Sequence, residues 1–435
     1  MPFCHTSRQW LIWNGKHWQR DEKGEIYRLA KETVRGMGRE AVNIEHDQDR
    51  RDSMKHALHA ESEPRMRAML KLAENEAGIP VTANDLDTDA MLFNALNGTI
   101  DLRSGAVRDH RRGDLITKIA PVSLDFAADC PRWKQFLLEV MGGETELIEY
   151  LQRAVGYTMT GSISAQVIFM LYGNGANGKT TFLETLRFVF GDYAATADFN
   201  SLMVTKTTGP RNDLAKLQGA RFVTAAETDE SSRLAEPIVK QLTGGDKVTA
   251  RQLYKEFVEY VPQHKFWLAM NHLPTIRGTD HAIWRWIQLI PFDVRIKDEQ
   301  LDRELPEKLK LEAPGILAWA LQGLTQYHRI GLSAPQAVKD ATRQYRDEQD
   351  VVGQYLVDAG IFEPMATTTG KSMYSGYKRW ASRGGDKWPM SEKRFSQSLA
   401  KRQELKKIKS SSGIVWSGIR LLPEISGSTE ELMVN

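Results

Sequence analysis

A glycine-rich loop between an apolar run and a helical pattern is the feature that most constrains this chain. Residues 167–190 are VIFMLYGNGANGKTTFLETLRFVF. The six residues before the loop are apolar or aromatic, as in a strand buried on both faces, and apolar residues recur at helical spacing after it. The loop matches G-x-x-x-x-G-K-[ST] from Gly173 to Thr180. The sequence therefore predicts a phosphate-binding loop in its required strand-to-helix context.

The residue types of this loop suit a nucleoside triphosphate. Glycines allow successive backbone N–H groups to converge on phosphate oxygens, Lys179 can reach the β- and γ-phosphates, and the Thr180 hydroxyl can bind Mg²⁺. We therefore expect ATP and Mg²⁺ as cofactors. The residues expected to contact the nucleotide are Gly173, Asn174, Gly175, Ala176, Asn177, Gly178, Lys179, Thr180 and Thr181.

Composition narrows the remaining possibilities. A chain of 435 residues is long enough for several domains, and its net charge of only +2 means that a nucleic-acid surface must come from local clusters of basic residues. The two cysteines, Cys4 and Cys130, are far apart and predict neither a zinc site nor a disulfide framework. No apolar run approaches the length of a membrane span, and the first residues do not resemble a signal peptide. We expect a cytoplasmic protein without a membrane partner.

The order of patterns along the chain predicts four segments. Residues 1–127 are expected to form an N-terminal α+β unit with a tight hairpin at Asn14-Gly15, and residues 128–165 a helical collar. Residues 166–333 are expected to form an α/β P-loop ATPase core, an AAA+-like sheet flanked by helices. Residues 334–435 are expected to form a basic, winged-helix-like C-terminal domain.

The C-terminal segment is the one place where charge is lopsided. Two helical patterns are followed by a hairpin pattern, KKIKSSSGIVWSGIRLL, which is the order of a winged helix-turn-helix. A solvated basic surface without a nucleic-acid partner is the alternative. Only Asp386, Glu392 and Glu404 oppose thirteen basic residues between positions 371 and 420: Lys371, Lys378, Arg379, Arg383, Lys387, Lys393, Arg394, Lys401, Arg402, Lys406, Lys407, Lys409 and Arg420.

Three further elements supply groups that ATP hydrolysis needs. The apolar run 222–226 predicts a buried strand that ends at Glu227, a candidate to order the metal and polarise water, with Asp229 as the next candidate. The run HKFWLAMNHLP predicts a strand that ends at Asn271, whose amide suits a sensor of nucleotide state. Arg285 lies between two tryptophans ahead of the last strand, and arginine is suited to stabilising transferred phosphate.

Together these elements resemble the superfamily 3 helicases, and within them the phage and plasmid primase-helicase group related to the poxvirus nucleoside triphosphatase. The segment NALNGTIDLRSGAVRDHRRGDLITK is similar to the one that precedes the helicase core in that group, so the resemblance covers nearly the whole chain. The motifs that carry it are GNGANGKTT, AAETDE, KQLTGGDKVTARQLYKE, MNHLP and IWRWIQLIPF.

The resemblance implies a replicative DNA helicase of a phage or mobile element, acting in the bacterial host cytoplasm. It would hydrolyse ATP in a hexameric ring and move 3′ to 5′ on single-stranded DNA to open forks, with a separate primase or polymerase as a possible partner. Lys179 and Thr180 would bind phosphates and Mg²⁺, and Glu227 would serve the metal and the water. Asn271 would be the sensor, and Arg285 the arginine finger acting on a neighbouring subunit. The residues available to grip DNA are Lys247, Arg251 and Lys255.

Two departures from the family pattern and three alternatives accompany this interpretation. Trp286 stands where relatives often place a second arginine, which leaves Arg277 as the runner-up finger, and Glu227 is followed by threonine rather than by another carboxylate.

A small-molecule kinase and a DNA-independent NTPase switch share the phosphate loop. An attached primase would need metal-binding carboxylates, but the preceding chain is too short for a primase fold, so we expect a free-standing helicase. The carboxylates that suggest such a site are Asp85, Asp87 and Asp89.

Overall fold

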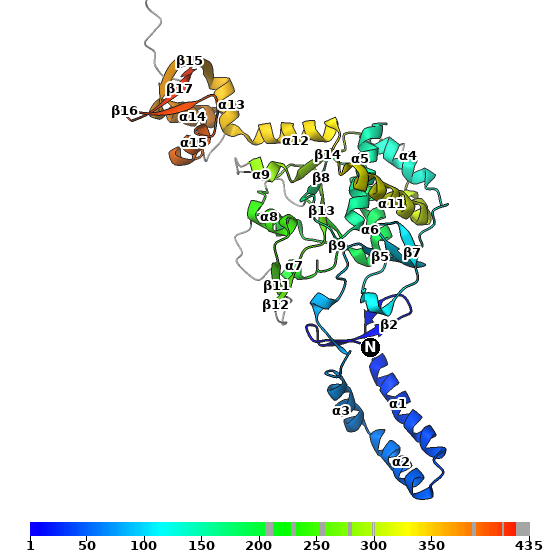
Figure 1. The fold of residues 1–435 in the computed structure, drawn as a ribbon. Coiled ribbons are helices and arrows are strands. Elements are labelled where there is room, and N and C mark those ends of the chain that lie inside the picture. The colour runs from blue at the N-terminus through cyan, green and yellow to red at the C-terminus, as the bar shows by residue number, and fades with distance from the viewer. Residues whose placement is uncertain are drawn as a thin grey trace, which may run out of the picture. The chain divides into compact units, whose positions relative to one another are not determined.

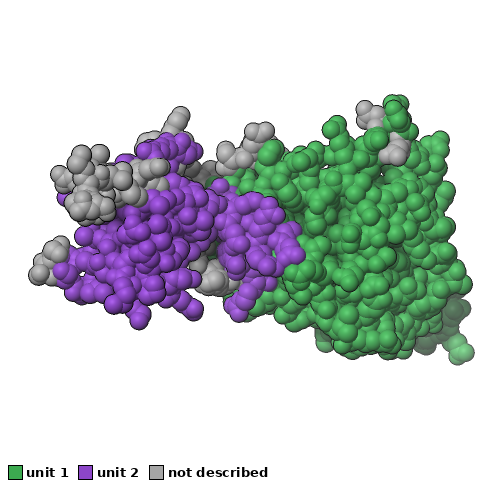
Figure 2. Space-filling view, turned by 90° about the horizontal axis from the view of Figure 1, so that it is seen from above, with its two compact units in different colours: residues 1–274, 286–339 green, residues 275–285, 340–435 purple. Residues whose placement is uncertain are grey.

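The computed structural model describes residues 1–204, 212–227, 232–251, 257–276, 281–297, 299, 301–384, 389–410 and 413–422. The chain divides into two compact units, which Figure 2 colours separately: Met1–Pro274 with Trp286–Lys339, and Thr275–Arg285 with Asp340–Asn435. The architecture is mixed α/β with a parallel sheet in the first unit. Among the described residues, no helix is both long and apolar enough to cross a bilayer.

The first unit begins with a small sheet, in the order β3-β2-β1-β4, and three helices that Figure 1 shows grouped together. The predicted hairpin is confirmed: β2 pairs with β3, and the Asn14 side-chain oxygen accepts hydrogen bonds from the backbone N–H of Lys16 (3.0 Å) and His17 (2.9 Å). The bounds are β1 (Phe3–Cys4), β2 (Gln9–Trp13), β3 (Trp18–Arg20), α1 (Glu25–Val42), α2 (Asp47–Ala60), α3 (Glu63–Ala73) and β4 (Pro80–Val81).

A second, antiparallel sheet follows, built from two successive hairpins. It shares its hydrophobic core with the rest of the unit, since Phe93 stacks on Tyr193 with ring centroids 4.4 Å apart. The core therefore runs across the expected boundaries at residues 127 and 165. The elements are η1 (Ala83–Asp85), β5 (Leu92–Ala95), β6 (Gly98–Asp101), β7 (Ala106–Arg108) and η2 (Arg112–Asp114).

The centre of the first unit is a five-stranded sheet in the order β14-β8-β13-β10-β9, with every neighbouring pair parallel. Because all five strands run the same way, their carboxyl ends meet at one edge, where ligands bind in open α/β sheets. The strands are β8 (Ile168–Tyr172), β9 (Ala194–Thr196), β10 (Phe222–Ala226), β13 (Lys265–Met270) and β14 (Ile287–Pro291). The helix after β8 is α6 (Lys179–Phe190).

Two pairs of helices pack around this sheet and enclose buried aromatic residues such as Trp133 and Phe182. The helices of the expected collar, α4 (Pro131–Val140) and α5 (Thr145–Met159), precede the sheet in sequence, and α10 (Leu305–Leu311) and α11 (Ala313–Ile330) follow it. Glycines let α5 and α11 touch backbone to backbone: a Cβ on Gly156 would lie 2.1 Å from Leu324 N, and one on Gly323 would lie 2.0 Å from Gln152 O.

The remaining elements of the first unit are short. A hairpin, β11 (Val248–Arg251) with β12 (Phe257–Tyr260), follows α8 (Glu236–Gly244) and belongs to the segment in which we expect DNA contacts. The others are η3 (Gly191–Tyr193), η4 (Phe199–Leu202) and α7 (Asn212–Ala215).

In the second unit, the helices α13, α14 and α15 and a sheet in the order β15-β17-β16 surround the buried Tyr355, Tyr377 and Trp416. Both predicted helices and the final hairpin are present, whereas β15 and its irregular pairing with β17 were not foreseen. Residues 275–285 join this unit because Trp284 packs edge-on against Tyr345, with centroids 5.0 Å apart. The elements are α9 (His281–Trp284), α12 (Gln336–Gln349), α13 (Val351–Ala359), β15 (Gly360–Thr369), α14 (Gly370–Arg383), α15 (Glu392–Leu399), β16 (Lys406–Ser410) and β17 (Gly413–Leu421).

Candidate functional site

The glycine-rich loop joins β8 to α6 at the carboxyl edge of the central sheet. Gly175, Ala176 and Gly178 have φ angles of 81°, 48° and 84°, the left-handed values that build an anion-binding concavity from backbone N–H groups. At Gly173 space rather than φ requires glycine, since an added Cβ would lie 2.2 Å from the carbonyl oxygen of Phe292. The loop therefore has the geometry of a phosphate cradle at the N-terminus of a helix.

Lys179, the first residue of α6, points its ammonium back into this loop. Its Nζ donates hydrogen bonds to Gly173 O (2.6 Å), Asn177 Oδ1 (3.0 Å) and Asn271 Oδ1 (3.2 Å). Burial lowers the pKa of the ammonium below its usual value, and the Glu227 carboxylate opposes that shift. The three oxygens are neutral, so a phosphate oxygen would be a better partner for the charge than any of them.

Glu227 follows β10 directly, and Asn271 follows the neighbouring strand β13. The Glu227 Oε2 accepts hydrogen bonds from the backbone N–H of Asn271 (2.6 Å) and of His272 (2.7 Å). Its Oε1 is buried without a hydrogen-bond partner and lies 3.4 Å from His272 Nδ1. The structure thus brings three of the predicted residues together: Lys179, Glu227 and Asn271.

The donor set fits the magnesium nucleotide that the sequence predicts. A buried carboxylate oxygen without a hydrogen bond is the acceptor that a hydrated cation or an attacking water needs. Thr180 is exposed in the first turn of α6, where its hydroxyl is accessible, and Thr181 is partly buried. Among the described residues there is no cluster of three or more His, Cys, Asp or Glu that would hold a metal without a ligand's help. Mg²⁺ would be held by one or two protein groups together with the phosphates.

The other predicted site residues lie elsewhere. Arg285 is exposed and belongs to the second unit, although the sequence predicted it within the core segment. Lys247 is exposed just before β11, and Arg251 ends that strand opposite Phe257. Three candidates fall outside the described residues: Asp229, Lys255 and Arg277.

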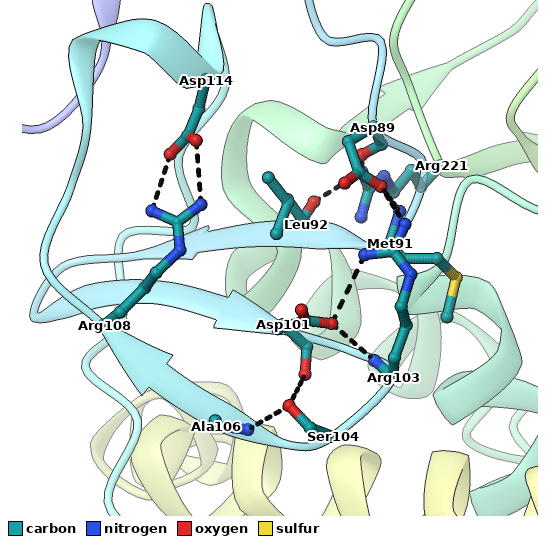
Figure 3. A network of polar contacts seen from close by, with 10 residues as sticks. All are labelled: Asp89, Met91, Leu92, Asp101, Arg103, Ser104, Ala106, Arg108, Asp114 and Arg221. Atoms are coloured by element: carbon teal, nitrogen blue, oxygen red, sulfur yellow. Dashed lines mark hydrogen bonds and ion pairs between the residues drawn. The ribbon is translucent and has the colours of Figure 1, made fainter.

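The three N-terminal carboxylates considered for a primase site have other partners. Asp85 caps η1 through Thr82, and Asp87 accepts from the backbone N–H of Thr117 at 2.7 Å. Figure 3 shows Asp89 held by Arg103, with Nη2 at 2.7 Å from the carboxylate. These carboxylates thus stabilise turns and loops in the region where the second sheet meets the core.

Two buried polar side chains that connect separate segments of the structure were not predicted from the sequence. Asn177 was counted only as a loop residue, yet its buried amide joins Lys179 to the end of β14. Arg221 was not noticed, although it is buried before β10, donates to Leu92 O (2.7 Å) and Met159 O (2.6 Å), and lies over the Tyr193 ring at 4.7 Å. Figure 3 shows its approach to Leu92. A lone arginine immediately before an apolar strand is the signal that could have pointed to it.

Comparison with known proteins identifies the relatives of this chain. A family model described as D5 N terminal like matches residues 2–142, and the model of a family of unknown function, DUF5906, matches residues 171–285. A protein of Acanthamoeba polyphaga mimivirus named "Putative helicase" is 30% identical over 304 residues, which are 64% of this chain and 32% of that protein. One of Frog virus 3 with the same description is 23% identical over 389 residues, 70% of this chain and 40% of that protein.

Two further matches are a second kind of viral protein and a solved structure. A protein of African swine fever virus named "Putative primase" is 28% identical over 122 residues, 27% of this chain and 13% of that protein. The apo structure of the NrS-1 C-terminal region shares the fold with a TM-score of 0.53 at 10% identity, covering 96% of this chain and 94% of that one. This chain spans less than half the length of these curated relatives. The predicted resemblance is confirmed: residues 2–142 match the model described as D5 N terminal like, and the chain is similar to virus-encoded proteins with helicase and primase names.

Proposed function

We propose that this chain is an ATP-dependent replicative DNA helicase of a phage or other mobile element. The observation that carries the proposal is the meeting of Lys179, Glu227 and Asn271 beside the glycine-rich loop, at the carboxyl edge of a five-stranded parallel sheet. Each of these residues comes from a different element, and together they offer a phosphate ligand, a carboxylate and an amide. The relatives with helicase names support the same assignment.

Within this proposal, bound Mg-ATP supplies the scissile phosphoanhydride bond and a cation that stabilises developing charge. The loop N–H groups and Lys179 hold the phosphates, and Thr180 ligates the cation. The Glu227 Oε1 orients a water, while the two backbone N–H groups on Oε2 keep the carboxylate in one orientation. The same carboxylate fixes the backbone of Asn271, and this positions the Asn271 side chain to contact the γ-phosphate.

A hexameric ring is the assembly we propose, because Arg285 is exposed and a finger of this kind acts on the nucleotide of a neighbouring subunit. Single-stranded DNA would contact the segment around the β11–β12 hairpin. Lys247 is exposed at its start and provides a cation for backbone phosphates.

We interpret the second unit as a winged helix that adds a duplex contact near the fork. Its chain order of α13, β15, α14, α15, β16 and β17 matches that class, and α15 is the helix that would face DNA. Two arginines are already neutralised: Arg402 by Asp350 (2.6 Å) and Arg420 by Glu363 (3.1 Å). Exposed cations on α15 and β16 provide the phosphate contacts: Lys393, Arg394, Lys406, Lys407 and Lys409.

The experiment that tests this function is the steady-state ATP hydrolysis rate with and without single-stranded DNA. Lys179→Ala is the blank, since it removes the phosphate-binding ammonium. We expect hydrolysis that DNA stimulates, followed by strand separation on tailed forks. A rate that DNA leaves unchanged would favour an NTPase switch, and a Lys179→Ala protein that hydrolyses ATP normally would refute the nucleotide site.

A further inference from the structure

The amide of Asn177 is buried against protein groups, although this residue belongs to the loop expected to contact the nucleotide. Asn177 is 4% exposed, whereas Asn174 in the same loop is exposed. The two ends of its amide have different partners: Nδ2 donates to Phe292 O at 2.9 Å, and Oδ1 accepts from Lys179 Nζ at 3.0 Å. A single side chain therefore connects the loop, the first residue of α6 and the residue that follows β14.

A second bond ties the loop to the same segment. The backbone N–H of Ile296 donates to Ala176 O at 2.8 Å, so residues 292–296 contact the loop at two successive positions. Gly173 makes this approach possible, because a Cβ there would lie 2.3 Å from Asn177 Nδ2. The loop is thus held in its phosphate-binding shape by protein contacts, which reduces the entropy that nucleotide binding must remove.

The Lys179 ammonium donates hydrogen bonds to two amide oxygens that belong to different parts of the site. Asn177 belongs to the loop that would surround the β-phosphate, while Asn271 lies at the end of β13 beside the Glu227 carboxylate. If phosphate oxygens replaced both amide oxygens as partners of Lys179, its ammonium could turn to the nucleotide without a movement of α6. The two asparagines then differ in what they sense, because ADP has only the phosphates that the loop surrounds.

We propose that Asn177 is a positioning residue that sets the affinity of the loop for the β-phosphate, and that of the two asparagines only Asn271 helps to distinguish triphosphate from diphosphate. This inference rests on the proposed ATPase function and adds a division of labour within it. Both ends of the Asn177 amide face protein groups, Phe292 O and Lys179 Nζ, so its loss should weaken binding and leave the chemical step intact.

The test is the affinity of the full chain for ADP and for a non-hydrolysable ATP analogue, measured by calorimetry. In Asn177→Ala both affinities should fall by about tenfold, equivalent to about 1.4 kcal/mol. KM for ATP should rise by a similar factor while kcat at saturating ATP stays within about twofold of the wild type. Asn271→Ala should keep its ADP affinity and lose kcat. Asn200→Ala, the same change at an exposed position, should alter neither affinity.

A folding control accompanies these measurements. The thermal midpoint without nucleotide shows whether Asn177→Ala is folded, and Asn177→Ser, which is too short to reach both partners, gives a second variant with the same expected loss. Wild-type ADP affinity in either folded variant would overturn the proposal, as would a fall in kcat at unchanged KM. Failure of the ATPase proposal is recognised separately, because Lys179→Ala would then bind and hydrolyse ATP as the wild type does.

Discussion

The Glu227 carboxylate and the backbone N–H of Asn271 are joined by a hydrogen bond of 2.6 Å. The bond ties the carboxyl end of β10 to that of β13, and the neighbouring N–H of His272 strengthens the connection at 2.7 Å. One carboxylate oxygen thus holds the backbone that follows β13, and the other is buried without a hydrogen-bond partner. The same residue therefore shapes the loop after β13 and serves the proposed water.

This double role predicts different outcomes for two changes at Glu227. Glu227→Gln keeps an oxygen for the two N–H groups but removes the charge that polarises water, so kcat should fall by about 10²–10⁴-fold with nucleotide affinity retained. Glu227→Ala should also weaken binding of a non-hydrolysable ATP analogue, because the loop that carries Asn271 loses its anchor. Single-turnover hydrolysis and titrations with this analogue separate the two variants. Equal loss of affinity for the analogue in both variants would contradict the scaffold role.

The exposed position of Arg285 predicts complementation between two inactive proteins. Arg285→Ala keeps its phosphate loop, and Lys179→Ala keeps its arginine. In randomly mixed rings about one interface in four would combine an intact loop with an intact arginine, so mixing should restore about a quarter of the wild-type rate. The measurement is ATP hydrolysis after unfolding and refolding the two proteins together. No recovery in rings shown to be mixed would move the finger assignment to Arg277.

Two glycines of the loop should respond differently to an added methyl group. Gly173→Ala forces a Cβ to within 2.2 Å of Phe292 O and should reduce ADP affinity by more than about tenfold. Gly175 has no neighbour within 4 Å of such a Cβ and is constrained only by its φ of 81°. Gly175→Ala should therefore cost about 1 kcal/mol of loop stability and lose less affinity. The reverse ranking in ADP titrations would argue against this packing of the loop on β14.

Acid stability should report on the buried imidazole of His264. Burial, and then the adjacent Lys265, lower the pKa of His264 to about 3 from an ordinary value of 6.5. Between these values the unfolded chain binds a proton that the folded chain does not, so stability is complete above pH 6.5 and falls as pH drops toward 3. His264→Leu should remove up to about 1.4 kcal/mol per pH unit from the slope of unfolding free energy against pH. Urea unfolding of both proteins across this range provides the measurement, and equal slopes would contradict it.

Much of the fold could be predicted because its signals are local. The strand before Glu227 spans the predicted residues 222–226, and the strand, loop and helix around Lys179 follow from an apolar run, a glycine pattern and helical periodicity. The hairpin at Asn14 follows from turn chemistry in the same way. Patterns within a few residues of one another are sufficient for elements of this kind.

Features that depend on distant residues could not be predicted. The contact of Lys179 with Asn271 requires β13 to lie next to β8, a neighbour relation that no local pattern encodes. Residues 275–285 group with the C-terminal unit because Trp284 meets Tyr345, a pairing across about sixty positions that only tertiary packing creates. β15 escaped notice since its residues alternate weakly and Pro364 interrupts them.

The close contact between Gly156 and Leu324 limits how this protein can be shortened. A Cβ added to Gly156 would lie only 2.1 Å from Leu324 N, so α5 and α11 pack backbone to backbone and their facing surfaces are not suited to contact with water. A fragment beginning at residue 166 would expose the buried face of α11, including Ile316, Leu317 and Ala320, to water. Such an apolar surface promotes aggregation. The smallest soluble ATPase cut from this chain should therefore retain α11, both helices of the collar and the second sheet, whose Phe93 packs on Tyr193 in the same core.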